Sequence, residues 1–341
     1  MTRIAPVALA LAALAVAAGL RAADAGEQAR RSGRVLRVEH RGSEMVRVPA
    51  GTFTMGFDGD EEHEVERARA ACAEAIGAGG KDWCTERWLT GEDTSLLFLM
   101  PWGNAAPQRV VFLPPFDIDR FEVTVADYRR CVSAGVCDSG PLIQGDQRHH
   151  GDPRNPITNV TWRDAADYCA FAGKRLPSEA EWEKAARGTD GRTWPWGNQE
   201  RRDGGNFGRM EAEVLRRTAA AQVPGFSSQF EATFALAPDA SDGAAAAVPP
   251  GTMRWSESRY GALDMAGNVA EWVLDYYYPF GYSDLPLDAP VRRVPHESDA
   301  RRVVRGGSFL DLPLAGRTYA RSAASPNTRS PLIGFRCARD A

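Results

Sequence analysis

Positive charge is not in excess in this sequence. Its 41 Lys and Arg side chains are outnumbered by 45 Asp and Glu, which gives a formal net charge of −4. Holding a nucleic acid or an anionic membrane requires a basic surface, so neither is an expected partner. Histidine is scarce too. No two of the five histidines have the His-x-x-x-His spacing that places two metal ligands on one helix face.

Long apolar runs are also missing, except at the N-terminus. No later segment reaches the ~18 uninterrupted apolar residues of a membrane span. We therefore expect the chain to be soluble once its N-terminal apolar run has been removed. The N-terminus has Arg3, an apolar run over 5–18 and small residues at Ala23 and Ala25, a pattern typical of a secretory signal. It predicts a signal peptide over 1–25, then a flexible segment over 26–43, and a periplasmic or extracellular protein. An apolar core helix is the alternative.

Six cysteines are present, and in an exported chain they predict disulfides because the compartment is oxidising. Their spacing suggests two local pairs, Cys72–Cys84 and Cys131–Cys137, which leaves Cys169 to Cys337. That last bridge would close a loop of roughly 170 residues, and on the chain-entropy model it would stabilise the fold by about 4–5 kcal/mol.

Short alternating segments dominate the rest of the pattern. Residues 57–107 and 211–250 interrupt it and are interpreted as insertions. Helices are predicted from Thr124, over 164–173 and from Ser178, where Glu181 three residues later completes a capping box. Strands are predicted at 45–48, 52–56, 110–113, 116–119, 302–305 and 334–337. Many short strands, few helices and long loops predict one irregular α+β domain over 44–341.

A series of short motifs occurs along this domain. They are Met45–Gly56, Phe121–Thr124, Asn155–Ile157, Val160–Trp162, Gly173–Glu183, Trp194–Asn198, Met265–Trp272, Arg305–Phe309 and Gly334–Cys337. In these residues and in their order, the chain resembles the formylglycine-generating enzyme (sulfatase-modifying factor) family. The resemblance implies a single domain of that type, a variant of the C-type-lectin-like fold. The tryptophans and glycines of the motifs would equally serve core packing, so they identify a fold rather than an activity.

The resemblance also implies two calcium sites built from oxygen ligands, which suit a hard cation. One would use the side chains or carbonyls of Asp264, Gly267, Val269 and Glu271. The other would use those of Asn206, Phe207, Asp242 and Ala244, with Asp239 as a rival to Asp242. The sequence favours the first site, because the gap between the Asn and the Asp of the second is longer than usual. Alternatively, Asp264 and Glu271 only accept hydrogen bonds from the backbone.

Copper is not expected. The family's enzyme oxidises a sulfatase cysteine with copper held by two thiolates that follow the Gly-Gly-Ser motif. Counted from Ser308, the resemblance places Asp311 and Gly316 at these positions. Neither offers the soft sulfur that Cu(I) prefers, so we expect no formylglycine-generating activity. A further family disulfide would have Ala186 and Arg321 at its positions, whereas Cys169 and Cys337 match the family's other bridge.

Two functional hypotheses follow. In the first, the domain is a non-catalytic binding or assembly and maturation module, and the former substrate groove holds a peptide, a glycan or a protein. In the second, it is a periplasmic enzyme with altered oxidative or maturation chemistry, like relatives in siderophore maturation. Converging polar groups with perturbed pKa values would favour the enzyme. The candidate groove contacts, which are alternatively exposed loop residues, are Ser308, Asp311, Arg317 and Arg321.

Overall fold

The computed structural model describes most of the chain beyond residue 36. The described residues are 37–40, 43–57, 105–210, 236–238, 240–253, 255–278, 281–295, 300–311 and 313–341. The predicted signal peptide, the predicted Cys72–Cys84 pair and most of both predicted insertions lie outside them. Within this described part, no helix is long and apolar enough to cross a membrane.

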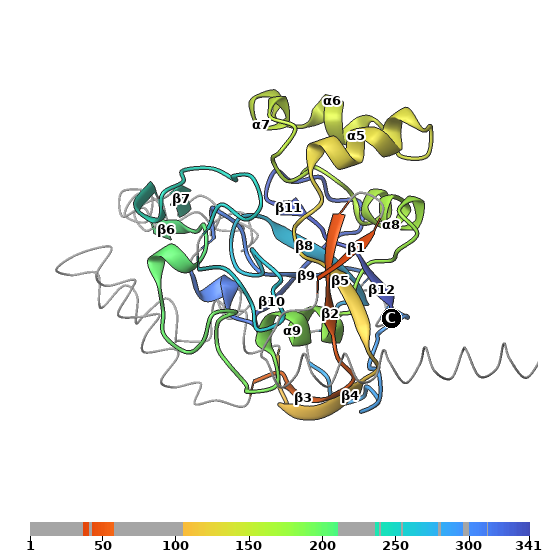
Figure 1. The fold of residues 1–341 in the computed structure, drawn as a ribbon, viewed down its shortest axis with the longest axis vertical. Coiled ribbons are helices and arrows are strands. Elements are labelled where there is room, and N and C mark those ends of the chain that lie inside the picture. The colour runs from red at the N-terminus through yellow and green to blue at the C-terminus, as the bar shows by residue number, and fades with distance from the viewer. Residues whose placement is uncertain are drawn as a thin grey trace, which may run out of the picture.

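One four-stranded antiparallel sheet joins the two ends of the described chain, with the strand order β1-β2-β5-β12 (Figure 1). Its strands are β1 (Arg37–His40), β2 (Ser43–Val48), β5 (Phe116–Asp119) and β12 (Ala338–Asp340). The flexible segment predicted over 26–43 is corrected at residues 37–40. They form β1 because their backbone pairs with residues 43–46 of β2.

The second four-stranded sheet has the order β10-β9-β8-β11. Its strands are β8 (Ala270–Tyr276), β9 (Arg302–Arg305), β10 (Arg321–Ala324) and β11 (Ile333–Gly334), of which β11 runs parallel to β8. The strand predicted over 334–337 is therefore corrected. Residues 335–337 cross from this sheet to the first one, because the buried side chains of Arg336 and Cys337 are held by an ion pair and a disulfide.

Two pairs of strands complete the described sheets. Strands β3 (Gly51–Met55) and β4 (Arg109–Leu113) pair with each other, and both put alternate side chains into the core, as their apolar alternation predicts. Strands β6 (Gly208–Met210) and β7 (Leu236–Pro238) bracket the undescribed residues 211–235. The segment 211–250 is thus not all loop. A short 3-10 helix, η2 (Ala240–Asp242), lies after β7 and ends at Asp242.

Five α-helices are described, and three of them begin at a capping box. They are α5 (Val125–Ser133), α6 (Gly140–Gln144), α7 (Gln147–Gly151), α8 (Trp162–Phe171) and α9 (Glu179–Arg187). The caps of α5 and α8 are Thr124 and Thr161, and α9 has the predicted Ser178–Glu181 box. The sequence pattern does not indicate α6 and α7, which are only five residues long.

Helix α9 is the centre of the core, although its sequence is highly charged. All nine of its residues are buried. Glu179 accepts hydrogen bonds from Arg321 at 2.8 and 2.7 Å and from Arg305 at 3.0 Å. Glu183 accepts one from Arg305 at 2.9 Å. The helix can be buried because arginines of β9 and β10 neutralise its carboxylates.

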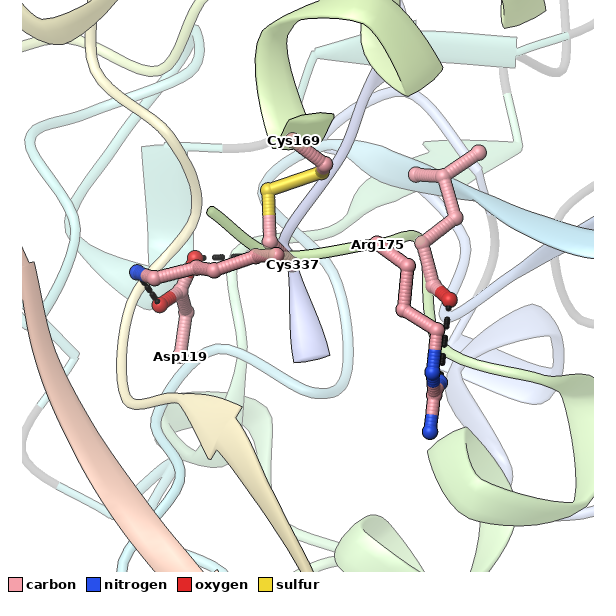
Figure 2. Close-up of a disulfide and its surroundings, with 6 residues drawn as sticks. Asp119, Cys169, Arg175 and Cys337 are labelled. Atoms are coloured by element: carbon pink, nitrogen blue, oxygen red, sulfur yellow. Dashed lines mark hydrogen bonds and ion pairs between the residues drawn. A yellow bond between two sulfur atoms is a disulfide. The ribbon is translucent and has the colours of Figure 1, made fainter. Parts of the chain in front are cut away.

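Two of the predicted disulfides are confirmed. Cys131 is bonded to Cys137 within the α5 region, and Cys169 of α8 is bonded to Cys337 across 168 residues of sequence. Figure 2 shows the long-range bridge with Asp119 of β5 beside it. The Asp119 carboxylate accepts hydrogen bonds from Lys174 Nζ at 2.5 Å and from the Cys337 N–H at 3.0 Å. The end of the chain is therefore fixed to the middle by both a covalent bond and a buried ion pair.

Candidate functional site

The segment after the Gly-Gly-Ser motif is a closed turn. Gly306 and Gly307 both have positive φ, a conformation that favours glycine, and they lead into the buried Ser308. The N–H and the hydroxyl of Ser308 donate to Asp311 Oδ2 at 2.8 and 2.7 Å, and the Asp311 N–H donates to the Ser308 carbonyl at 3.0 Å. Burial raises the pKa of the Asp311 carboxyl above its ordinary value. One oxygen of Asp311 is thus used to hold the turn.

Gly316 lies at the end of a short 3-10 helix, η3 (Pro313–Gly316), and has no room for a side chain. A Cβ added there would stand 2.5 Å from Cζ of Phe207 and 3.2 Å from Cβ of Ala266. Phe207 packs edge-on against Trp194, whose ring stacks on Trp196 with 5.4 Å between centroids. An aromatic cluster therefore fills the space beside Gly316.

The four candidate groove residues do not form an exposed set. Ser308, Arg317 and Arg321 are all fully buried, and Asp311 is half-buried. The guanidinium of Arg317 lies 6.0 Å from the ring centroid of Trp194, next to the aromatic cluster. Arg321 instead forms an ion pair with Glu179, the first residue of α9. The structure brings Ser308 and Asp311 together and assigns Arg321 to the core.

In the calcium site that the sequence favours, the Glu271 carboxylate already has hydrogen-bond partners within the protein. Glu271 is completely buried, and its two oxygens accept hydrogen bonds from Nε and Nη2 of Arg336 at 2.7–2.9 Å and from Nε1 of Trp182 at 2.8 Å. Asp264 accepts a hydrogen bond from the Gly251 N–H, which is the backbone role allowed as the alternative. Among the described residues, no three His, Cys, Asp or Glu side chains are arranged to hold a metal ion.

The second predicted calcium site contains an unpaired oxygen. Asn206 is 0% exposed, and its Nδ2 donates to the carbonyl of Ala246 at 2.8 Å and to Oδ1 of Asn268 at 3.1 Å. Oδ1 of Asn206 is buried and accepts no hydrogen bond. A buried oxygen without a donor is unfavourable, and such atoms in folded proteins often mark a bound ion or water.

Asp242, at the end of η2, lies against the residue that follows Asn206. Its Oδ2 accepts a hydrogen bond from the Phe207 N–H at 2.7 Å, and its Oδ1 accepts one from the Ala244 N–H at 3.0 Å. The structure thus brings together Asn206, Phe207, Asp242 and Ala244 across a long insertion. The rival Asp239 lies outside the described residues. Carboxylate, amide and carbonyl oxygens are the ligands that calcium prefers, so this set fits a hard cation.

Glu122 is a buried acid that sequence reasoning missed. Its carboxylate accepts hydrogen bonds from Nδ2 of Asn268 at 2.9 and 3.2 Å and from the Val269 N–H at 3.3 Å. Burial raises its pKa well above the ordinary value, and the charges of Asp264 and Glu271 raise it further. The only sequence signal is a charged residue inside the Phe121–Thr124 motif. Glu122 connects the surroundings of the two predicted calcium sites through Asn268.

Comparison with known proteins gives a family match over nearly the whole chain. Residues 32–341 match the model of the sulfatase-modifying factor enzyme 1-like domain. A protein named formylglycine-generating enzyme from Streptomyces coelicolor is 36% identical over 56% of this chain and 54% of its own length. A mouse protein named inactive C-alpha-formylglycine-generating enzyme 2 is 30% identical over 54% of this chain and 49% of its own. The chain thus spans about half the length of these two relatives.

Among solved structures, PvdO from Pseudomonas aeruginosa is similar over most of both chains. The superposition has a TM-score of 0.60 and 25% sequence identity, and it covers 91% of this chain and 98% of PvdO. This similarity supports the fold expected from the motifs.

Proposed function

Because the chain belongs to the family of sulfatase-modifying factor enzyme 1-like domains, we propose that it is an exported, non-catalytic member that acts as a binding or assembly and maturation module. One observation carries this proposal. The turn after Gly-Gly-Ser is held by Asp311 and is followed by Gly316, beside which Phe207 leaves no space. The chain has no cysteine between Cys169 and Cys337, so no thiolate stands near this turn in the sequence.

Two further observations support the proposal. A relative whose name includes the word inactive matches half of the chain, so the fold is compatible with loss of the oxidase activity. Export is supported by the N-terminal sequence pattern and by the two disulfides, which form in oxidising compartments. The ligand in the former groove would be a peptide, a glycan or a partner protein.

The second candidate function is an enzyme with different oxidative or maturation chemistry. One observation favours it. The Asp311 carboxyl, whose pKa is raised by burial, accepts a hydrogen bond from the Ser308 hydroxyl at 2.7 Å. Raised carboxyl pKa values are common among catalytic acids and bases. In such an enzyme, Asp311 and Ser308 would be the candidates for proton transfer.

We expect the protein neither to bind Cu(I) tightly nor to convert the cysteine of a sulfatase peptide to formylglycine. Asp311 offers hard oxygen to a soft ion, and Gly316 offers no ligand. The protein would be incubated with copper, oxygen and the peptide, and the aldehyde would be sought by mass spectrometry. The Streptomyces coelicolor enzyme serves as the positive control. Aldehyde above the level of a no-protein reaction would contradict the proposal.

A gain-of-binding experiment makes the copper prediction sharper. The double variant Asp311→Cys/Gly316→Cys places thiols at both positions that the family resemblance assigns to copper. The new Cβ at residue 316 would meet the Phe207 ring at 2.5 Å. We therefore expect Cu(I) binding only when Phe207→Ala is added to the double variant. Equal copper binding without Phe207→Ala would show that the aromatic ring does not obstruct the site.

We also propose calcium as a structural ion at Asn206 and Asp242. The unpaired buried Oδ1 of Asn206 supports this site, and the bound ion would join the 206–207 and 242–244 segments. At Asp264 and Glu271 a calcium ion would have to displace Arg336 from Glu271, so the residues there do not fit an ion as they are arranged. This reverses the preference that the sequence gives.

Calcium is expected to stabilise the folded protein. An ion that binds only the native state adds about 2.7 kcal/mol at roughly a hundredfold excess over Kd. Tm would be measured after chelator treatment, with and without added CaCl2. Asp242→Asn should abolish the shift, whereas Asp203→Asn, on the neighbouring 3-10 helix η1 (Arg202–Gly204), should retain it. A wild-type Tm that does not respond to calcium would refute a site of useful affinity.

A further inference from the structure

We propose that Asn268 is a positioning residue that fixes the side-chain amide of Asn206, so that Oδ1 of Asn206 faces the cation. This inference rests on the proposed calcium site. It concerns residues outside the predicted ligand set, since Asn268 is expected to contact no ion. The observation behind it is a partly buried chain of hydrogen bonds that runs from Val248 through Asn268 to Asn206.

The orientation of the Asn268 amide is determined by a backbone group. The Val248 N–H, which can only donate, lies 2.9 Å from Oδ1 of Asn268. The Val248 carbonyl, which can only accept, lies 3.1 Å from Nδ2. A flipped Asn268 amide would put donor against donor and acceptor against acceptor. Glu122, which accepts from Nδ2, adds to the same orientation.

The orientation of Asn206 then follows from that of Asn268. Its amide group faces two acceptors, Oδ1 of Asn268 at 3.1 Å and the Ala246 carbonyl at 2.8 Å, so Nδ2 must point toward them. Oδ1 of Asn206 must therefore point the other way, where it accepts no hydrogen bond from the protein. Without Asn268, Asn206 would lose one of the two contacts that prevent its amide from rotating.

The backbone of Asn268 allows a clean test. Its φ is 65°, a conformation that glycine adopts without strain. Its N–H donates to the Asn206 carbonyl at 2.8 Å, and its carbonyl accepts from the Phe309 N–H at 2.9 Å. Asn268→Gly keeps these backbone contacts and removes only the side chain. Asn159, with a φ of 59° and little exposure, is a matched site elsewhere in the fold.

The experiment is a calcium titration of the full-length protein by calorimetry. We expect Asn268→Gly to weaken the calcium Kd by about 10–100-fold, the usual effect of removing a group that orients a metal ligand. Asn159→Gly should leave Kd unchanged. Asn268→Asp should also weaken binding, because its second oxygen would replace the Nδ2 donor against the Glu122 carboxylate and the Val248 carbonyl. Wild-type affinity in Asn268→Gly would overturn the inference and leave the calcium site itself intact.

Absence of calcium binding by the wild type would instead refute the proposed site and, with it, this inference. If Asn268→Gly does not fold, a crystal structure of the wild type with calcium decides the question. The expected ion lies about 2.3–2.6 Å from Oδ1 of Asn206, with Nδ2 still donating to Asn268. An ion elsewhere, or a rotated Asn206 amide, would overturn the inference.

Discussion

Glu179→Ala is expected to destabilise the protein by about 3–5 kcal/mol, because it removes the carboxylate from a buried ion-pair network and leaves the arginines in place. The Glu179 carboxylate accepts hydrogen bonds from Arg305, Arg321 and the Tyr282 hydroxyl, at 2.7 to 3.2 Å. Removing it leaves two buried guanidinium groups without the carboxylate that faces both. Glu179→Gln keeps the side-chain volume and one acceptor oxygen, so it should lower the free energy of unfolding by less than Glu179→Ala.

The effect would be measured by urea unfolding and as a drop in Tm of roughly 6–15 °C. The matched control is Arg154→Ala, which removes an exposed ion pair with Asp152 and should leave Tm nearly unchanged. A loss in Glu179→Ala no larger than that in Arg154→Ala would show that the buried network does not stabilise the fold.

The same network gives a pH dependence with a definite sign. Burial raises the pKa of Glu179, but the charges of Arg321 and Arg305 lower it more, so the net pKa lies below its ordinary value. A lowered folded-state pKa gives stability that is present above about pH 4 and lost as the pH falls through the folded pKa. The wild type should therefore lose this contribution in acid, and Glu179→Gln should not.

Removing the Cys169–Cys337 bridge is expected to cost about twice as much stability as removing Cys131–Cys137. In the chain-entropy model, the loop of 168 residues gives about 4–5 kcal/mol and the loop of six residues gives about 2 kcal/mol. The two double Cys→Ala variants would be compared by urea unfolding without reductant. Peptide mapping under non-reducing conditions would check that the remaining bridges are native. Equal losses would contradict the loop-length argument.

Local features of the fold are predicted well from the sequence. The Ser178–Glu181 capping box involves residues three apart, so the start of α9 follows from a short pattern. The strands β3 and β4 follow from alternating apolar residues, although the pairing between them does not. The two described disulfides follow from an even cysteine count and export. Apart from the Cys169–Cys337 pairing, which follows from the spacing of the other cysteines, each of these depends on neighbouring residues.

Some missed features, such as the short helices α6 and α7, are local, but others depend on contacts between distant parts of the chain. Helix α9 has the charged sequence of an exposed helix, yet it is buried because Arg305 and Arg321 arrive from β9 and β10. We propose the opposite ranking of the two calcium sites because of contacts of the same kind. The sequence does not indicate that Arg336 pairs with Glu271, or that Glu122 holds Asn268.

The first sheet has a consequence for how the protein folds. Strand β5 lies between β2, near the start of the described chain, and β12, which ends at Asp340. The sheet cannot be completed until residues 338–340 pair with β5. Contacts between such distant segments slow folding, since a long loop must close before they form. For the export that we propose, slow folding would be an advantage, because a chain that crosses a membrane must do so before it folds.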